Sequence, residues 1–369
     1  MNNDAKNRNI ALLATGDEII NGDILNSNAK EIAQQLFNEK MLVGMHMVAG
    51  DNIEDIEAAI RFLLGSHAAL IITGGLGPTS DDLTRYALSR ALNKELIFDA
   101  EIWESIVNRL KSIGYHNFPE SNRQQAFFPE GSSIIQNPNG TAAGCIIEHG
   151  QQRIFMLPGP PFECFPMLAD MVIPTLKKLH FPQNVYFQKW LLFSVSEGEI
   201  AEKLDALTHA YDCETGYRIC YPYVECKLFS KNLDDFKILV PKITEVVKPY
   251  IFEDGSKTAS EILREKLKTL PLPLKITDYA TGGILESTLK TPDTFSHIQF
   301  VHEPHSEIEI RGLEEFWQNK NANETSLEFI FKKNNHIEQF KKTIPYRGSR
   351  VKQYAIEFIS KEILQYLLK

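Results

Sequence analysis

The first 160 residues alternate between short apolar runs and segments whose apolar residues recur at helical spacing. Residues 10–15 and 69–73 are continuous apolar runs, typical of strands buried on both faces, and residues 42–49 also predict a strand. Residues 29–37 and 53–64 carry apolar side chains at three- and four-residue steps, which predicts two amphipathic helices. This βαβαβ order predicts a mostly parallel sheet with helices on both faces.

Polar residues mark where these helices are expected to begin. Asn26 or Ser27 can cap the first helix, and Asp51 or Asn52 can cap the second. Gly65 is expected to end the second helix. Ligands of parallel α/β sheets bind beyond the carboxyl ends of the strands, so a site is expected in the loops that follow the strands.

Two further regions follow this α/β part. Residues 185–195 predict a strand that leads into a helix capped by Ser196 and Glu199, as expected for a small α+β module. A third α/β region begins near residue 257 and ends in a helix over 350–368. The predicted domains are 1–175, 176–256 and 257–369.

Composition narrows the class of protein. Of the 369 residues, 43% are hydrophobic and 24% charged, which is typical of a globular chain. No run approaches the roughly 18 apolar residues of a membrane span, and the N-terminus has no signal-peptide core, so we expect a cytoplasmic protein without a membrane partner. The net charge of −9 disfavours nucleic-acid binding. The five cysteines form no metal spacing and are expected to be reduced thiols.

The most informative motif is TGGLGPTSDDLT at residues 73–84. Gly74, Gly75 and Gly77 free the backbone just past a strand, as in loops that approach a phosphate closely. Thr79 or Ser80 can cap the next helix, whose N-terminal amides attract phosphate. The motif therefore predicts a phosphate-binding loop.

Adjacent Asp81 and Asp82 would repel a phosphate directly. This conflict disappears if a divalent cation lies between the carboxylates and the phosphate oxygens. Alternatively, both acids only favour the dipole of the helix in its first turn. The spacing does not decide between these interpretations.

Three more loops are expected at the same edge of the sheet, in residues 14–29, 137–144 and 157–164. Between the last strands, residues 121–126 supply Arg123, the one cation in these motifs suited to bidentate phosphate contact. Each loop also has a simpler interpretation, such as a solvated acid at a helix start or a surface arginine.

The segments GDEIINGDI, GGLGPTSDDLT, NRQQAFFPEG, NPNGTAAG and LPGPPFE, in this order and spacing, closely resemble the N-terminal domain of the CinA family, which is related to the molybdopterin-binding domains of cofactor biosynthesis. The resemblance covers roughly residues 8–175. It implies a three-layer, molybdopterin-binding-like α/β fold. Many members of the family are metal-dependent ADP-ribose pyrophosphatases that yield AMP and ribose 5-phosphate, so the resemblance also implies this activity.

The resemblance also implies roles for individual residues. Asp81 and Asp82 would be catalytic and would hold a divalent metal ion, Mg, Mn or Co. The expected residues for binding the small-molecule nucleotide substrate are Gly74, Gly75, Gly77, Thr79, Thr84, Asp17, Glu18, Asn28, Arg123, Asn137, Gly140, Thr141, Gly159 and Glu163. Two departures from the family pattern, Ala143 and Cys164, are interpreted as packing changes. A protein that only binds a nucleotide or molybdopterin remains an alternative.

The remaining regions resemble the family less closely. Residues 176–256 resemble its small KH-type domain but lack a GXXG nucleic-acid clamp. Residues 278–283 (DYATGG) align with the nucleophile motif of its nicotinamide-nucleotide amidase domain, with Tyr279 in the place of the serine. A phenol of pKa about 10 cannot readily replace an activated serine, so we expect a degenerate domain, with residual amidase activity as the alternative.

Full-length relatives are dimers, which implies a homodimer here. The last helix carries an apolar stripe that is wide enough to pack on a partner, or else within its own domain. The stripe consists of Val351, Ala355, Phe358, Ile359, Ile363 and Leu367 or Leu368. His302 and His305 are interpreted as a surface strand end rather than a metal site.

Overall fold

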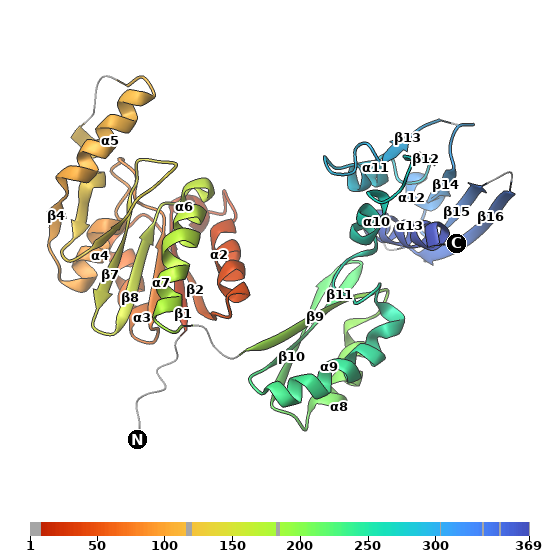
Figure 1. Cartoon of the computed structure of the whole chain (residues 1–369), viewed down its shortest axis with the longest axis horizontal. Helices are drawn as coiled ribbons and strands as arrows, with labels where there is room; N and C mark the ends of the chain where they lie inside the picture. The colour runs from red at the N-terminus through yellow and green to blue at the C-terminus, as the bar shows by residue number, and fades with distance from the viewer. Residues whose placement is uncertain are drawn as a thin grey trace. The chain divides into compact units, whose positions relative to one another are not determined.

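The computed structural model describes residues 9–115, 120–181, 185–302, 304–333, 336–346 and 348–368. The chain divides into two compact units, residues 1–184 and 185–369, and each is described by itself. The regions expected at 176–256 and 257–369 thus lie mostly within the second unit (Figure 1).

The first unit is built on a six-stranded sheet in the order β2-β1-β3-β8-β7-β6. The four strands from β2 to β8 run parallel, and β7 pairs antiparallel with both β8 and β6, which confirms the mostly parallel sheet. The strands of the unit are β1 (Ile10–Thr15), β2 (Val43–Ala49), β3 (Ala69–Thr73), β4 (Leu96–Phe98), β5 (Phe127–Pro129), β6 (Ser133–Ile135), β7 (Gly144–His149) and β8 (Gln152–Leu157).

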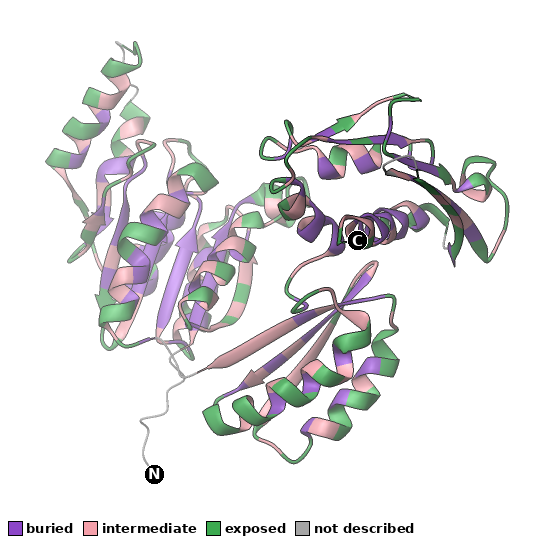
Figure 2. Ribbon diagram, turned by 45° about the vertical axis from the view of Figure 1, so that its right-hand side comes forward, coloured by how far each residue is buried: buried purple, intermediate pink, exposed green. Residues whose placement is uncertain are grey.

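Helices cover both faces of this sheet, because successive residues of β1 and β3 point to opposite faces and all are buried. Leu13 and Ile72 pack in the core beneath α3 and α4, whereas Leu12 and Ile71 pack beneath α2, α6 and α7. In Figure 2 the central strands of this sheet are coloured as buried, and the helices around them have exposed outer faces. The helical elements are α1 (Asp17–Ile20), α2 (Ser27–Asn38), α3 (Ile53–Leu64), α4 (Thr84–Leu92), α5 (Ala100–Ser112), η1 (Glu120–Ala126), α6 (Pro161–Met167), η2 (Leu168–Val172) and α7 (Ile173–Lys178).

In the first unit, helix starts follow the predicted caps in two cases and depart in a third. Asn26 accepts a hydrogen bond from Ala29 N, and Asn52 caps α3 through Glu54 N and Asp55 N. Helix α4 begins only at Thr84 and has no side-chain cap, so the prediction that Thr79 or Ser80 caps it is wrong. Residues 78–83 instead form turns, since their polar side chains hydrogen-bond within the loop.

The second unit contains a three-stranded antiparallel sheet in the order β10-β11-β9 and a five-stranded sheet in the order β13-β12-β14-β15-β16. Its strands are β9 (Tyr186–Phe193), β10 (Cys213–Cys220), β11 (Tyr223–Ser230), β12 (Leu274–Asp278), β13 (Ile298–Phe300), β14 (Ile308–Gly312), β15 (Glu324–Lys333) and β16 (His336–Pro345). Its helical elements are α8 (Glu197–Thr208), α9 (Leu233–Val247), η3 (Lys248–Tyr250), α10 (Ala259–Leu267), α11 (Ile284–Leu289), α12 (Glu314–Trp317), η4 (Gly348–Arg350) and α13 (Val351–Leu368). The KH-type assignment of its first part stays a prediction.

Helix α13 packs in the core of its own unit. Val351, Ala355, Ile359 and Ile363 are all fully buried there, against the five-stranded sheet. For these four residues the alternative holds that the stripe packs within its own domain, whereas Leu368 at its end is 75% exposed. The homodimer stays a prediction that this helix does not support. Among the described helices, none is both long and apolar enough to cross a bilayer.

Candidate functional site

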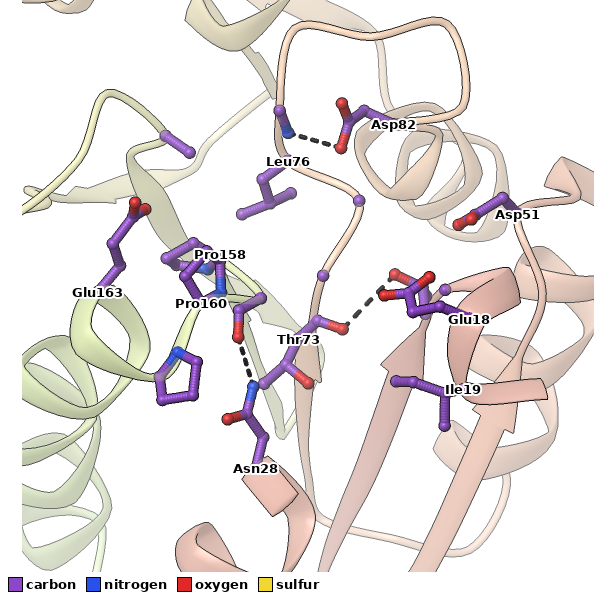
Figure 3. A pocket seen from close by; sticks show the side chains of 18 of the residues that line it. Glu18, Ile19, Asn28, Asp51, Thr73, Leu76, Asp82, Pro158, Pro160 and Glu163 are labelled. Atoms are coloured by element: carbon purple, nitrogen blue, oxygen red, sulfur yellow. Dashed lines mark hydrogen bonds between the residues drawn. The ribbon is translucent and has the colours of Figure 1, made fainter. Parts of the chain in front are cut away.

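A cavity of about 550 Å³ opens at the carboxyl ends of the parallel strands (Figure 3). Its walls come from the loops that follow β1, β2, β3 and β8, together with part of the 137–144 loop. These loops were predicted to share one edge of the sheet, and the parallel strands bring them there. The volume lies within the range of about 300–1,000 Å³ that is common for small-molecule sites.

The glycine loop after β3 forms the back of this cavity. Gly74 and Gly75 have φ angles of +102° and +63°, a backbone conformation that other residues rarely adopt. A β-carbon would also overlap the Thr15 carbonyl at the first position and the Thr84 hydroxyl at the second. Thr84 Oγ1 lies 3.0 Å from Thr15 Oγ1 and is buried. Thr84 thus holds the loop from behind and does not line the cavity.

Asp82 closes the same loop on itself. Its Oδ1 accepts a hydrogen bond from Gly77 N at 2.7 Å, and its Oδ2 accepts from Thr79 N at 2.9 Å and Thr79 Oγ1 at 2.6 Å. The glutamines of η1 fasten the loop from outside: Gln124 Nε2 donates to the carbonyls of Gly77 and Thr79, and Gln125 Nε2 to that of Leu76. The loop is therefore preorganised without a ligand.

Acidic side chains form one wall of the cavity, where Glu18 and Asp51 lie (Figure 3). Asp51 and Asp17 are linked reciprocally: Asp17 N donates to Asp51 Oδ2 at 3.0 Å, and Asp51 N donates to Asp17 Oδ1 at 2.9 Å. Burial raises the pKa of Asp51, and so do the charges of Asp17, Glu18 and Asp81, against the opposing hydrogen bond from Asp17 N. Asp17 thus positions Asp51 and does not itself line the cavity.

Glu163 lies on a separate wall, beside the prolines that follow β8 (Figure 3). Asn137 Nδ2 donates to Glu163 Oε2 at 2.7 Å. The carboxylate packs against Gly140, where a β-carbon would overlap it. At the base of the cavity, Asn28 Nδ2 donates to the carbonyl of Gly159 at 2.6 Å.

The charges around the cavity are one-sided. Five carboxylates line it, and no lysine, arginine or histidine does among the residues that the structure describes. Arg123, expected to contact phosphate, is turned elsewhere: it forms an ion pair with Glu120 at 3.1 Å and lies 4.8 Å from the Phe98 ring. A phosphate in this cavity would therefore meet acids, backbone amides and neutral polar side chains such as Ser27 and Thr141, but no cationic side chain of the described residues.

Within the described ranges, no three His, Cys, Asp or Glu side chains come together in a group that could hold a metal ion by itself. Neither the pair Asp81 and Asp82 nor the pair His302 and His305 has a third such side chain beside it among the described residues. A metal ion bound between protein and phosphate needs only one or two carboxylates, because phosphate and water supply the other oxygens.

The structure sorts the expected binding residues into three groups. Those that line the cavity are Gly74, Gly75, Gly77, Asp81, Asp82, Glu18, Asn28, Thr141, Gly159 and Glu163. Those that support the lining from behind are Thr79, Thr84, Asp17, Asn137 and Gly140. Arg123 belongs to neither group.

Sequence reasoning missed several lining residues, among them Thr15, Asp51 and Gln125. Asp51 was weighed only as a helix cap, yet Asn52 takes that role. The available signal was its position at the end of a parallel strand, where functional side chains gather. Gln125 lies in the same short motif as Arg123, and here the glutamines contact the glycine loop.

The stretch aligned with the amidase nucleophile is closed in the second unit. Asp278 Oδ1 accepts hydrogen bonds from Ala280 N and Thr281 N, both at 2.9 Å. Trp317 Nε1 donates to the Ala280 carbonyl at 2.7 Å, and its ring occupies the space beside Gly282. Tyr279 is half-exposed and stands where a serine would be expected.

Comparison with known proteins agrees with the fold. Residues 11–178 match a family model described as "Probable molybdopterin binding domain". A competence-damage inducible protein from Caldicellulosiruptor saccharolyticus is 32% identical over 281 residues, which are 74% of this chain and 68% of that protein. A CinA-like protein from Shewanella woodyi is 30% identical over 285 residues, 76% of this chain and 67% of that protein.

Two solved structures are also similar to the chain. A CinA protein from Thermoplasma acidophilum is 28% identical with a TM-score of 0.43, and the match covers 47% of this chain and 99% of that one. The molybdopterin biosynthesis Mog protein from Mycobacterium ulcerans is 18% identical with a TM-score of 0.31, covering 47% and 99%.

Proposed function

The chain belongs to the CinA family of competence-damage inducible proteins, and from this membership and the cavity's geometry we propose that its first unit hydrolyses a nucleoside diphosphate compound with a divalent metal ion. ADP-ribose, cleaved to AMP and ribose 5-phosphate, is the first candidate substrate. The observation that carries the proposal is a glycine-walled cavity lined by five carboxylates and, among the described residues, by no cationic side chain.

The charge of the cavity supports a bound cation. A pyrophosphate carries negative charge, and a wall of carboxylates repels it unless positive charge intervenes. The donor set suits Mg, Mn or Co, because carboxylate oxygens are hard ligands. We assign Asp81 and Asp82 to hold the ion, which supplies charge neutralisation and a water of lowered pKa when bound.

The chain's own residues bind and orient the substrate in this proposal. Gly74, Gly75 and Gly77 let the loop fold closely against Thr15, Thr84 and Asp82, where β-carbons would overlap. In this proposal the loop then offers its backbone to the pyrophosphate. Asp82 keeps this loop closed through its three hydrogen bonds, so little reorganisation is needed on binding. Asp51 and Glu18 hold negative charge on the adjacent wall, which favours a cation there.

The test is turnover of a panel of nucleoside diphosphate compounds with Mg, Mn or Co, read by mass spectrometry. We expect ADP-ribose to give AMP and ribose 5-phosphate only when a divalent cation is present. Equal activity in excess chelator would refute the metal's role, and the absence of cleavage across the panel would refute the hydrolase.

A second candidate is a protein that binds a nucleotide or a molybdopterin without turnover. The match of residues 11–178 to a molybdopterin-binding model favours it. Saturable binding of panel members without products would support this candidate.

A further inference from the structure

Glu163 lies in the first turn of α6, apart from the other acids of the cavity. In Figure 3, Glu18 and Asp51 lie on one side of the cavity, and Glu163 lies on the other side beyond Pro158 and Pro160. An acid at this position is separated from the wall assigned to the metal ion. Its partner in a bound ligand is therefore a different part of that ligand.

Asn137 fixes the Glu163 carboxylate rigidly. The Asn137 oxygen accepts hydrogen bonds from Asn139 N and Gly140 N at 2.9 and 2.8 Å. Its amide nitrogen donates to the Ala142 carbonyl at 3.0 Å and to Glu163 Oε2 at 2.7 Å. Both ends of the amide are thus engaged, and its orientation is set by backbone groups.

The second oxygen of Glu163 remains available. No side chain or backbone group in the described part of the chain donates a hydrogen bond to Oε1, and Glu163 is only half-buried. Gly140 lets the 137–144 loop pack closely against one side of the carboxylate, and the remaining side borders the cavity. This oxygen is an anionic acceptor that lacks a donor.

A second acceptor without a donor belongs to the same cavity. Gln125 is 2% exposed, its Nε2 donates to the Leu76 carbonyl at 3.3 Å, and its Oε1 is buried without a partner. The Leu76 carbonyl fixes the orientation of the amide, because the reverse orientation would bring two acceptors together. The cavity therefore suits a ligand that brings hydrogen-bond donors as well as phosphate.

A phosphate cannot satisfy Glu163, because its oxygens are acceptors and negatively charged. A sugar hydroxyl can, because it donates a hydrogen bond and carries no charge, and hydrogen bonds to a carboxylate are among the stronger ones. Acidic residues recognise ribose hydroxyls in this way in other α/β nucleotide sites.

We propose that Glu163, positioned by Asn137, accepts a hydrogen bond from a hydroxyl of the nucleoside ribose and so selects ribonucleotides over their deoxy analogues. This role of Glu163 rests on the proposed function, because the hydrolase proposal places a nucleotide in the same cavity. It adds a specificity that hydrolysis itself does not require.

The test compares the binding of ADP and 2′,3′-dideoxy-ADP to the full chain with Mn²⁺, by isothermal titration calorimetry. We expect the wild type to prefer ADP by roughly 10-fold or more, as for a hydrogen bond to a charged group. Glu163→Met has similar length and keeps only a weak, uncharged sulfur acceptor, so the preference should fall below about 2-fold. The affinity for the dideoxy analogue should stay unchanged, which shows that the cavity is intact.

Glu148→Gln is the matched control, since Glu148 is an exposed acid that pairs with Arg153 outside the cavity. It should keep the full preference for ADP. A wild type that binds both nucleotides equally, or neither at millimolar concentration, would overturn the proposal, and so would a Glu163→Met variant that keeps the preference.

Cleavage of ADP-ribose is measured on the same samples and separates the two proposals. Ribose preference without cleavage leaves the role of Glu163 standing and refutes the hydrolase. Cleavage without ribose preference leaves the hydrolase standing and refutes the role of Glu163.

Discussion

Replacing Asp82 by Asn tests whether its two oxygens hold the glycine loop in its working form. One oxygen accepts from Gly77 N, and the other accepts from both the backbone and the hydroxyl of Thr79. An asparagine has a single acceptor oxygen, so its NH₂ group must face at least one of these donors. Asp82→Asn therefore removes the negative charge and one or two of the three hydrogen bonds.

The magnitude follows from these contacts. A hydrogen bond to a charged group contributes about 1.5–3 kcal/mol. A loss of about 2.7 kcal/mol corresponds to roughly 100-fold in rate. We expect kcat/KM for ADP-ribose to fall at least ~100-fold, within the range for losing one preorganised contact to the transition state.

The assay is steady-state hydrolysis of ADP-ribose over a range of Mg²⁺ concentrations, with thermal unfolding of the same samples. Asp81→Asn is compared with Asp82→Asn, because the proposal assigns both acids to the metal ion but Asp81 is exposed and accepts no hydrogen bond from Gly77. It should raise the Mg²⁺ concentration needed for half-maximal rate and leave the melting temperature unchanged. Asp82→Asn should lower both the rate and the melting temperature. Unaltered turnover in Asp82→Asn would refute the reasoning and move the chemistry elsewhere.

Three further outcomes are expected. The pKa of Asp51 is raised, chiefly by burial, so the folded state loses stability as the pH rises through that pKa and the carboxylate ionises. Asp51→Asn removes this ionisation and should raise the melting temperature at pH 7 but not near pH 3. Equal changes in melting temperature at both pH values would contradict this. In the second unit, the buried Glu357 carboxylate accepts hydrogen bonds from the Tyr223 hydroxyl at 2.7 Å and from Ser260 N and Oγ at 3.0 and 2.7 Å. Glu357→Gln should lower the free energy of unfolding by about 2–3 kcal/mol in urea titrations, and an unchanged midpoint would show that the contact is not needed. The protein should release no ammonia from nicotinamide mononucleotide, and Tyr279→Ser should not restore release; a rate of about 1 per second or faster would show that this stretch was misaligned.

Much of the first unit follows from local sequence. The continuous apolar runs of β1 and β3 could be recognised because strands buried on both faces need an apolar side chain at every position. Helix α3 begins and ends where predicted, since Asn52 and Gly65 act on their own neighbouring backbone. The edge of the sheet that carries the cavity also followed, because parallel strands bring their carboxyl ends together.

Other features depend on contacts that the folded backbone sets, both within a loop and between residues far apart in the chain. The motifs named four of the five lining acids but not Asp51, and they did not show that Asp82 turns back onto Gly77 or that Asp17 supports Asp51. Arg123 carries the right charge for phosphate, yet Glu120 and Phe98 hold it elsewhere. A pattern of residue types states what a side chain can bind, and only the folded backbone states which partner is within reach.

The last helix shows the same limit for packing. Its periodicity established that α13 has an apolar face, because burying such a face is what makes an amphipathic helix stable. The periodicity did not identify the surface that covers this face, since a partner chain and the chain's own strands offer the same apolar contact. The five-stranded sheet of the second unit covers it, and residues such as Ala355 and Ile359 are fully buried there. The sequence alone determined that the helix has an apolar face that must be buried. The tertiary structure determined which surface this face packs against.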